Sequence, residues 1–134
     1  IEITKHADWR KHPQGEWSLT EIACHLRDVE IEINQPRLRK ILDEANPFIA
    51  AIDSDEWALP RAYTIQDGDA VFAAFVEARR ETLTLLDGLP EEDWKRPARH
   101  GVFGPTTLQE LVSFTVEHDR THLRQMRELL EIGV

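Results

Sequence analysis

The chain has 134 residues with a hydrophobic share of 41% and a charged share of 31%, the proportions of one soluble globular domain over residues 1–134. Because 25 acidic side chains outnumber 16 basic ones, the formal net charge is -9, and the average surface would repel nucleic acid. A single cysteine, Cys24, excludes an intrachain disulfide framework and indicates a reducing cytoplasm, and no apolar run is long enough to span a membrane.

The first predicted helix begins at Ser18. Glu21 follows Ser18 by three residues, which is the capping box that marks a helix start. Apolar residues then recur at helical spacing and form one stripe: Ile22, Leu26, Val29 and Ile33. Pro36 has no backbone donor, so we expect it to interrupt and kink this helix, which resumes until Asn46-Pro47 stops it.

Residues 46–68 have no sustained period and are predicted to form a long loop. Its aromatic residues Trp57 and Tyr63 are expected to anchor the loop to the rest of the protein, with a lid over a site as the alternative. A further helix is predicted from Asp69 to Asp87, because apolar residues recur there at helical spacing and Gly88 follows as a stop signal.

The last predicted helix follows a second loop, residues 89–105. Thr107 and Glu110 repeat the capping box, and the helical pattern continues to about Glu131. No segment has the alternation of polar and apolar residues that is typical of a strand. Long amphipathic helices without strands predict an all-α fold, an antiparallel four-helix bundle.

Three histidines are the candidate metal ligands. On a helix, His118 and His122 lie within about 40° of each other, on the side that also carries apolar residues. An H-x-x-x-H pair alone is more often two packed core histidines, since histidine is intermediate in burial. His25 flanks the apolar stripe of the first helix and also faces the interior. Three inward imidazoles are better explained by one divalent metal ion, zinc or nickel first, with manganese or iron as alternatives.

Two sharper metal motifs do not fit. The stretch "HDRTH" has the spacing of the H-E-x-x-H metalloprotease helix, but Asp119 stands where the glutamate base belongs. No histidine follows His122 to complete such a site. The Glu-x-x-His motif of di-iron bundles does not occur.

Three polar residues lie near the predicted ligands on their helices. Asp28 follows His25 by three residues and is the candidate catalytic residue, because it could orient an imidazole or take a proton. The alternative is that Asp28 is only the solvated edge of the apolar stripe, and the same alternative applies to Glu32. Gln125 could bind a ligand or form an interhelical bond.

The stretches "EWSLTEIACHLRDVE", "EEDWKR" and "GPTTLQELVSFTVEHDRTHLRQM" resemble the DinB-like metal-dependent proteins, which include the YfiT-type candidate hydrolases and bacterial thiol S-transferases. The resemblance implies a four-helix bundle that holds one divalent metal through His25, His118 and His122. Members of that family usually carry a full helix before the tryptophan, whereas sixteen residues precede Trp17 here and the chain begins at Ile1. We therefore expect a truncated first helix, of which Trp9 is a remnant.

These observations predict a metal-dependent enzyme whose open coordination position activates a thiol or a water. By resemblance, the expected reaction is thiol S-transfer or a related hydrolysis. The expected partner is a small-molecule substrate, such as a low-molecular-weight thiol, and a homodimer could cover apolar surface left by a missing helix. The alternative function is a non-catalytic bundle that binds a metal or a small molecule.

Overall fold

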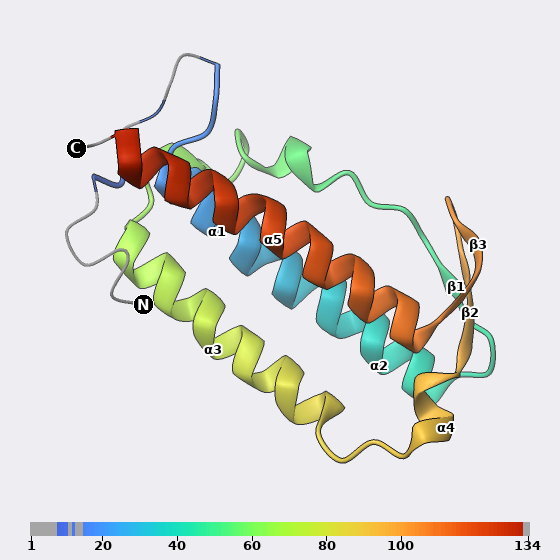
Figure 1. Ribbon diagram of the computed structural model, residues 1–134. Helices are drawn as coiled ribbons and strands as arrows, with labels where there is room; N and C mark the ends of the chain where they lie inside the picture. Colours follow the sequence, from blue (N-terminus) through green and yellow to red (C-terminus); the bar gives the residue numbers. More distant parts are fainter. Residues whose placement is uncertain (1–7, 11, 13–14, 133–134) are drawn as a thin grey trace.

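The computed structural model describes residues 8–10, 12 and 15–132, and its long helices run alongside one another with a small sheet at one end (Figure 1). This arrangement confirms the predicted helical bundle. Within the described residues the helices of the bundle are α1 Leu19–Val29, α2 Gln35–Asp43, α3 Gly68–Leu86 and α5 Leu108–Ile132. A short α4, Glu91–Trp94, precedes the sheet.

The capping box at the start of α1 is confirmed. The Glu21 backbone N–H donates to the Ser18 hydroxyl, and the Ser18 N–H donates to the Glu21 carboxylate, both at 3.2 Å. The apolar stripe that follows is buried against α3 and α5 in a core cluster of Leu19, Ile22, Leu26, Phe75, Met126 and Leu129. Burying one such side chain contributes roughly 1.5–3 kcal/mol, so this cluster sets the spacing between the three helices.

Pro36 does not interrupt the first helix, contrary to the sequence prediction. A π-helical segment, Glu30–Asn34, joins α1 to α2, and the Gln35 N–H donates to the carbonyl of Glu30, five residues earlier. Pro36 then lies in the first turn of α2, where a missing N–H costs little. The wider turn continues the helix and places the polar side chains of Glu30 and Asn34 in the interior.

The predicted loops contain three short strands, so the expectation of no strands was wrong. They are β1 Phe48–Ile49, β2 Pro97–His100 and β3 Gly104–Thr107, in the order β1-β2-β3. β1 runs parallel to β2, and β2 runs antiparallel to β3. Strands this short have too few residues to show alternation, and β1 pairs with a segment about fifty residues away. Ile49 and Ala98 cover the core end formed by α2 and the start of α5.

The segment between β1 and α3 is anchored by Tyr63, as predicted. Tyr63 is fully buried, and its hydroxyl donates to the Asp28 carboxylate at 2.6 Å. Burial raises the pKa of Tyr63, and the bond to Asp28 raises it further, so the phenol stays protonated. The Trp57 ring is half-buried beneath the Arg61 guanidinium, 4.0 Å from its centroid.

The expected remnant of a first helix falls mainly on residues 1–7, 11, 13 and 14, which lie outside the described residues. Trp9 itself is described, and its carbonyl accepts hydrogen bonds from the backbone N–H and hydroxyl of Thr20. Its ring lies directly against Gly68, where a Cβ would collide with the indole. The start of α3 therefore requires glycine at this position.

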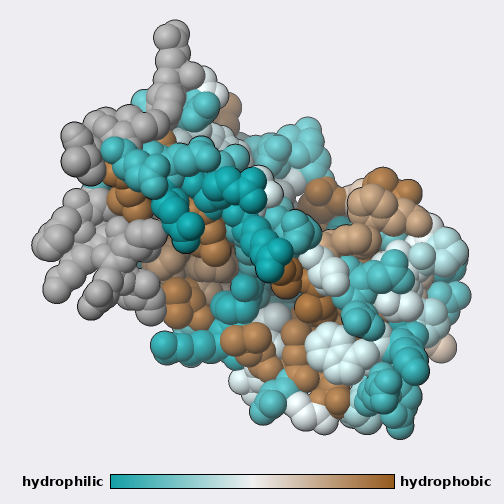
Figure 2. All heavy atoms as spheres, in the orientation of Figure 1, coloured by the Kyte–Doolittle hydropathy of each residue, from teal (hydrophilic) through white to brown (hydrophobic). Residues whose placement is uncertain are grey.

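The described helices include none that is long and apolar enough to cross a lipid bilayer. Figure 2 shows hydrophilic residues interspersed with several small hydrophobic patches on one face of the molecule. Surface of this mixed kind is normal for a globular domain.

We predict that Tyr63→Phe lowers the free energy of unfolding by about 1–2 kcal/mol, because Asp28 loses a buried hydrogen-bond donor while the ring still fills its space. Urea unfolding followed by circular dichroism measures the change. Thr64→Ala, at an exposed position next to it, is the control and should stay within about 0.5 kcal/mol of wild type. Equal stabilities of Tyr63→Phe and wild type would show that the hydroxyl does not anchor the segment.

Candidate metal centre

The three predicted ligands meet between α1 and α5, where His25 is buried and His118 and His122 are half-buried. His25 comes from the middle of α1, and His118 and His122 come from successive turns of α5. Their candidate ligand atoms all lie within 4.8 Å of one another, and the Nε2 atoms of His25 and His118 are 3.0 Å apart. Two nitrogens bound to one tetrahedral zinc ion are separated by about 3.3 Å. The fold therefore gathers these side chains at the spacing of a shared cation.

The indole of Trp17 forms one wall of the histidine cluster. Its centroid lies 5.1 Å from that of His25 and 6.4 Å from that of His122, and it is stacked on the latter ring. Ser18 caps α1 immediately afterwards, so the capping box also places Trp17. The ring shields one side of the cluster from water and restricts the rotation of two imidazoles.

Two of the imidazoles are oriented by hydrogen bonds at Nδ1. His118 Nδ1 lies 3.1 Å from Asp119 Oδ1, and His122 Nδ1 lies 2.9 Å from Gln125 Oε1. A carboxylate only accepts, so Asp119 fixes the proton on Nδ1 of His118 and leaves the Nε2 lone pair free for a cation. The Gln125 side-chain oxygen fixes the proton on Nδ1 of His122 in the same way. The sequence analysis did not predict that Gln125 orients a histidine. Within the described residues, Nδ1 of His25 is buried without a partner.

The surroundings lower the pKa of two of the imidazoles, those of His25 and His122. Burial lowers the pKa of His25 to about 3, with a further contribution from the neighbouring His122 and His118. Burial also lowers the pKa of His122, against a smaller opposing effect of its bond to Gln125. A metal ion competes with protons for the ring nitrogens, so lowered pKa values favour metal binding at neutral pH.

A chain of buried polar side chains holds Asp119 in place. Arg79 of α3 pairs with Asp119 on one side and with Glu30 on the other, at 2.6 Å from Nε to Oε2 of Glu30. Asn34 donates to the same glutamate at 2.7 Å. Burial alone would raise the pKa of Asp119, but the bonds from His118 and Arg79 outweigh it and hold the pKa below its usual value. The orientation of His118 thus depends on side chains from three helical segments, which are α5, α3 and the π-helical segment Glu30–Asn34.

Sequence reasoning missed Glu30, Arg79 and the role of Asp119. One signal was available for Glu30, because it follows Leu26 by four residues and so continues the buried stripe with a carboxylate. A fully buried glutamate requires a cation as partner. Nothing local identified Arg79 as that cation, because α3 contains a second arginine beside it, Arg80.

Asp28 lies near the cluster but is bound to other groups. It accepts from Arg27 at 2.8 Å, Arg61 at 3.1 Å and the hydroxyl of Tyr63. Burial would raise the pKa of Asp28, but these bonds outweigh it and lower the pKa. Glu32 is exposed and pairs with Arg61. A part for Asp28 in chemistry stays a prediction.

Cys24 is no ligand in this arrangement. It is fully buried in a cluster with Ala23, Tyr63 and Val71, on another side of α1 from His25. Burial raises the pKa of its thiol to about 11. The side chain is therefore a packed thiol.

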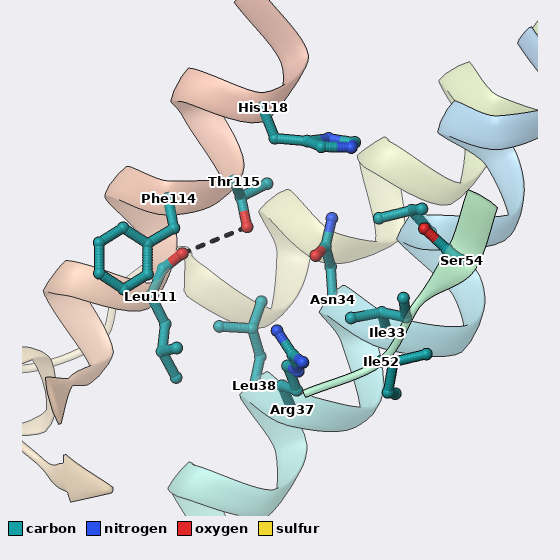
Figure 3. Close-up of a pocket in the computed structure, with 11 residues that line it drawn as sticks. Ile33, Asn34, Arg37, Leu38, Ile52, Ser54, Leu111, Phe114, Thr115 and His118 are labelled. Atoms are coloured by element: carbon teal, nitrogen blue, oxygen red, sulfur yellow. Dashed lines mark hydrogen bonds between the residues drawn. The ribbon is translucent and has the colours of Figure 1, made fainter. Parts of the chain in front are cut away.

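Two cavities reach the histidines from different sides. One has a volume of about 200 Å³ and includes His118, together with Asn34 and Arg37 (Figure 3). The other has a volume of about 480 Å³ and includes Trp17 and His122. The larger cavity falls within the usual size range of small-molecule sites, and the smaller one lies below it.

Together, the fold and the cluster define a helical bundle with a three-histidine site that could hold a metal ion. The sequence matches the DinB superfamily over residues 2–126, and the chain belongs to this family.

Individual relatives agree with this assignment. The chain is 25% identical to the uncharacterized protein YuaE of Bacillus subtilis, over 91% of this chain and 82% of that protein. It is also 25% identical to OB0782 of Oceanobacillus iheyensis, a candidate metal-dependent hydrolase by name, over 86% of this chain and 66% of that protein. Its fold is similar to the solved structure of YfiT from Bacillus subtilis, with a TM-score of 0.84 and 21% identity over 99% of this chain and 77% of that one. YfiT is described as a probable metal-dependent hydrolase with an unusual four-helix bundle topology.

We predict that Arg79→Gln destabilises the protein by roughly 2–4 kcal/mol and weakens metal affinity about 10- to 100-fold, because Glu30 and Asp119 lose their cation. Chemical denaturation measures the first effect and competition with a chelator dye measures the second. Arg80→Gln, which removes the exposed neighbouring cation, is the control and should change neither. Unchanged metal affinity in a folded Arg79→Gln protein would show that the ion pairs of Arg79 do not influence the metal centre.

The lowered pKa of Asp28 predicts a pH dependence of stability. Its contribution is present above the ordinary aspartate pKa of about 3.9 and is lost as the pH falls through the lower pKa of the folded state. Asp28→Asn should therefore be less stable than wild type at pH 7 and lose less stability between about pH 5 and pH 2. Denaturant unfolding at a series of pH values measures this, with the exposed Asp87→Asn as control. Parallel profiles for wild type and Asp28→Asn would contradict the prediction.

Proposed function

We propose that the protein is a divalent-metal-dependent enzyme that hydrolyses a small-molecule substrate. The observation that carries the proposal is the cluster of His25, His118 and His122, whose ligand atoms lie within 4.8 Å of one another. The description of two relatives as metal-dependent hydrolases supports the reaction class. Three protein ligands leave at least one position open, which is typical of catalytic rather than structural sites.

Each part of the cluster has a definite task in this proposal. The three imidazoles bind the ion, and Asp119 and Gln125 keep two of them in the tautomer that presents Nε2. The ion supplies Lewis acidity, which lowers the pKa of a water or a thiol toward neutral pH. Asp28 stays ionised three residues after His25, and we propose that its negative charge stabilises the cationic centre.

The donor set favours particular metals. Three imidazoles without a carboxylate ligand suit zinc or nickel, whereas manganese prefers oxygen ligands and iron sites usually include a carboxylate. We therefore propose zinc or nickel as the resident ion.

The test begins with metal content. Purified protein should contain about one equivalent of a divalent ion by plasma mass spectrometry, and His118→Ala and His122→Ala should lose it while staying folded by circular dichroism. His100→Ala is the matched control, because His100 lies outside the cluster and should leave the metal content unchanged. Retention of the ion by both cluster variants would place the metal elsewhere.

Turnover is measured on the same preparations with ester and amide substrates, and with a thiol plus an electrophile. Hydrolysis in proportion to metal content supports the proposal. Consumption of the thiol without hydrolysis would assign the site to S-transfer instead. A folded, metal-loaded protein that turns over none of these substrates and melts several degrees lower after chelation would favour a non-catalytic metal site.

A further inference from the structure

We infer that the cavity beside His118 selects substrates with a compact apolar body and a carboxylate end, and that Arg37 binds this carboxylate. The inference rests on the proposed function, because it names the substrate class of the same centre. Arg37 belongs to α2 and was not singled out by any motif in the sequence.

Arg37 is a cation without a matching anion. Its Nη2 donates to the carbonyl of Ala50 at 2.6 Å, while its Nε is buried and has no partner. Among the described residues no carboxylate forms an ion pair with it, although Arg27, Arg61 and Arg79 are all paired. Burial without a counterion also lowers the pKa of Arg37. A half-buried guanidinium left in this state is costly, and an anionic ligand would remove that cost.

The cavity around Arg37 suits a compact apolar body. Its walls include the apolar side chains Val29, Ile33, Leu38, Ile52, Leu111 and Phe114, and no acidic residue lines it. In Figure 3, His118 and Arg37 lie on opposite sides of the cavity, with Asn34 between them. A ligand whose carboxylate binds Arg37 therefore extends its other end toward the histidine cluster.

The size of the cavity limits the ligand. Its volume is about 200 Å³. A protein cavity of about 150 Å³ holds one benzene molecule, so this cavity admits roughly six to ten non-hydrogen atoms. Guanidinium groups bind carboxylates through two parallel hydrogen bonds, and the Arg37 side chain that lines this cavity has no carboxylate partner among the described residues.

The other cavity has the opposite charge. Three acidic residues, Glu16, Asp55 and Glu128, line it beside His122. An anionic substrate would be repelled there, and the net charge of -9 adds to the repulsion over the rest of the surface. The cavity beside His118 is thus the side of the cluster at which an anion is favoured.

The test compares hexanoate, hexanol and hexylammonium, which share an apolar chain and differ in the charge of the end group. Binding to the full-length metal-loaded protein is measured by isothermal titration calorimetry. We expect hexanoate to bind at least tenfold more tightly than hexanol, with hexylammonium weakest. Arg37→Gln should abolish this preference, and Arg39→Gln, which removes an exposed cation of the same helix, should retain it.

Two further measurements keep the test decisive. Arg37→Lys retains the charge without the fork of donors, so it should keep part of the preference for hexanoate over hexanol. It replaces Arg37→Gln in the test if that variant does not fold. In wild-type protein, hexanoate should shift the NMR resonance of the Arg37 Nε–H group, and hexanol should not. A purely structural role for Arg37 predicts no such shift.

A carboxylate can also bind a metal ion directly, so the titrations are repeated after chelation. Persistence of the hexanoate preference supports Arg37 as its binding group. Equal binding of hexanoate and hexanol, a preference unchanged in Arg37→Gln, or a preference lost on chelation would each overturn the inference. Failure of the proposed function looks different, because metal content or turnover would be missing while the carboxylate preference remained.

Discussion

The buried ion pairs of Arg79 are the interaction on which the rest of the site depends. One guanidinium from α3 binds Glu30, which is fully buried, and also binds Asp119. Because each carboxylate would be costly in the interior without this cation, the three helical segments must meet in one register. Asp119 in turn orients His118, so the same charges that join the helices also orient a candidate metal ligand.

The π-helical segment makes this arrangement possible. The segment carries the buried side chains of Glu30 and Asn34, and it ends just before Pro36, which lies in the first turn of α2. π-helical turns inside longer helices occur frequently at functional sites. Here the turn supplies polar groups to the interior, next to a cluster in which burial keeps His25 neutral. The bundle thus combines a dry core with a site suited to a cation.

The two cavities beside the histidine cluster differ in the charge of their linings. The cavity beside His118 is apolar with one cation, whereas the larger cavity beside His122 has an acidic lining. The charge therefore differs on the two sides of the same three imidazoles. Members of one family can share a fold and differ in such linings, so membership of the DinB superfamily does not by itself name a substrate.

The sequence by itself determined the helices and the three histidines that face the interior, because capping residues and apolar periodicity are local properties of the chain. It did not predict the short strands, the continuous helix through Pro36, or the pairing of Glu30 with Arg79. The strands and the ion pair depend on residues far apart in the chain, and a local pattern does not identify the distant partner. Only the tertiary structure decided which buried charges pair and that Arg37 finds no carboxylate partner within the described residues, because burial and distance arise when the helices pack.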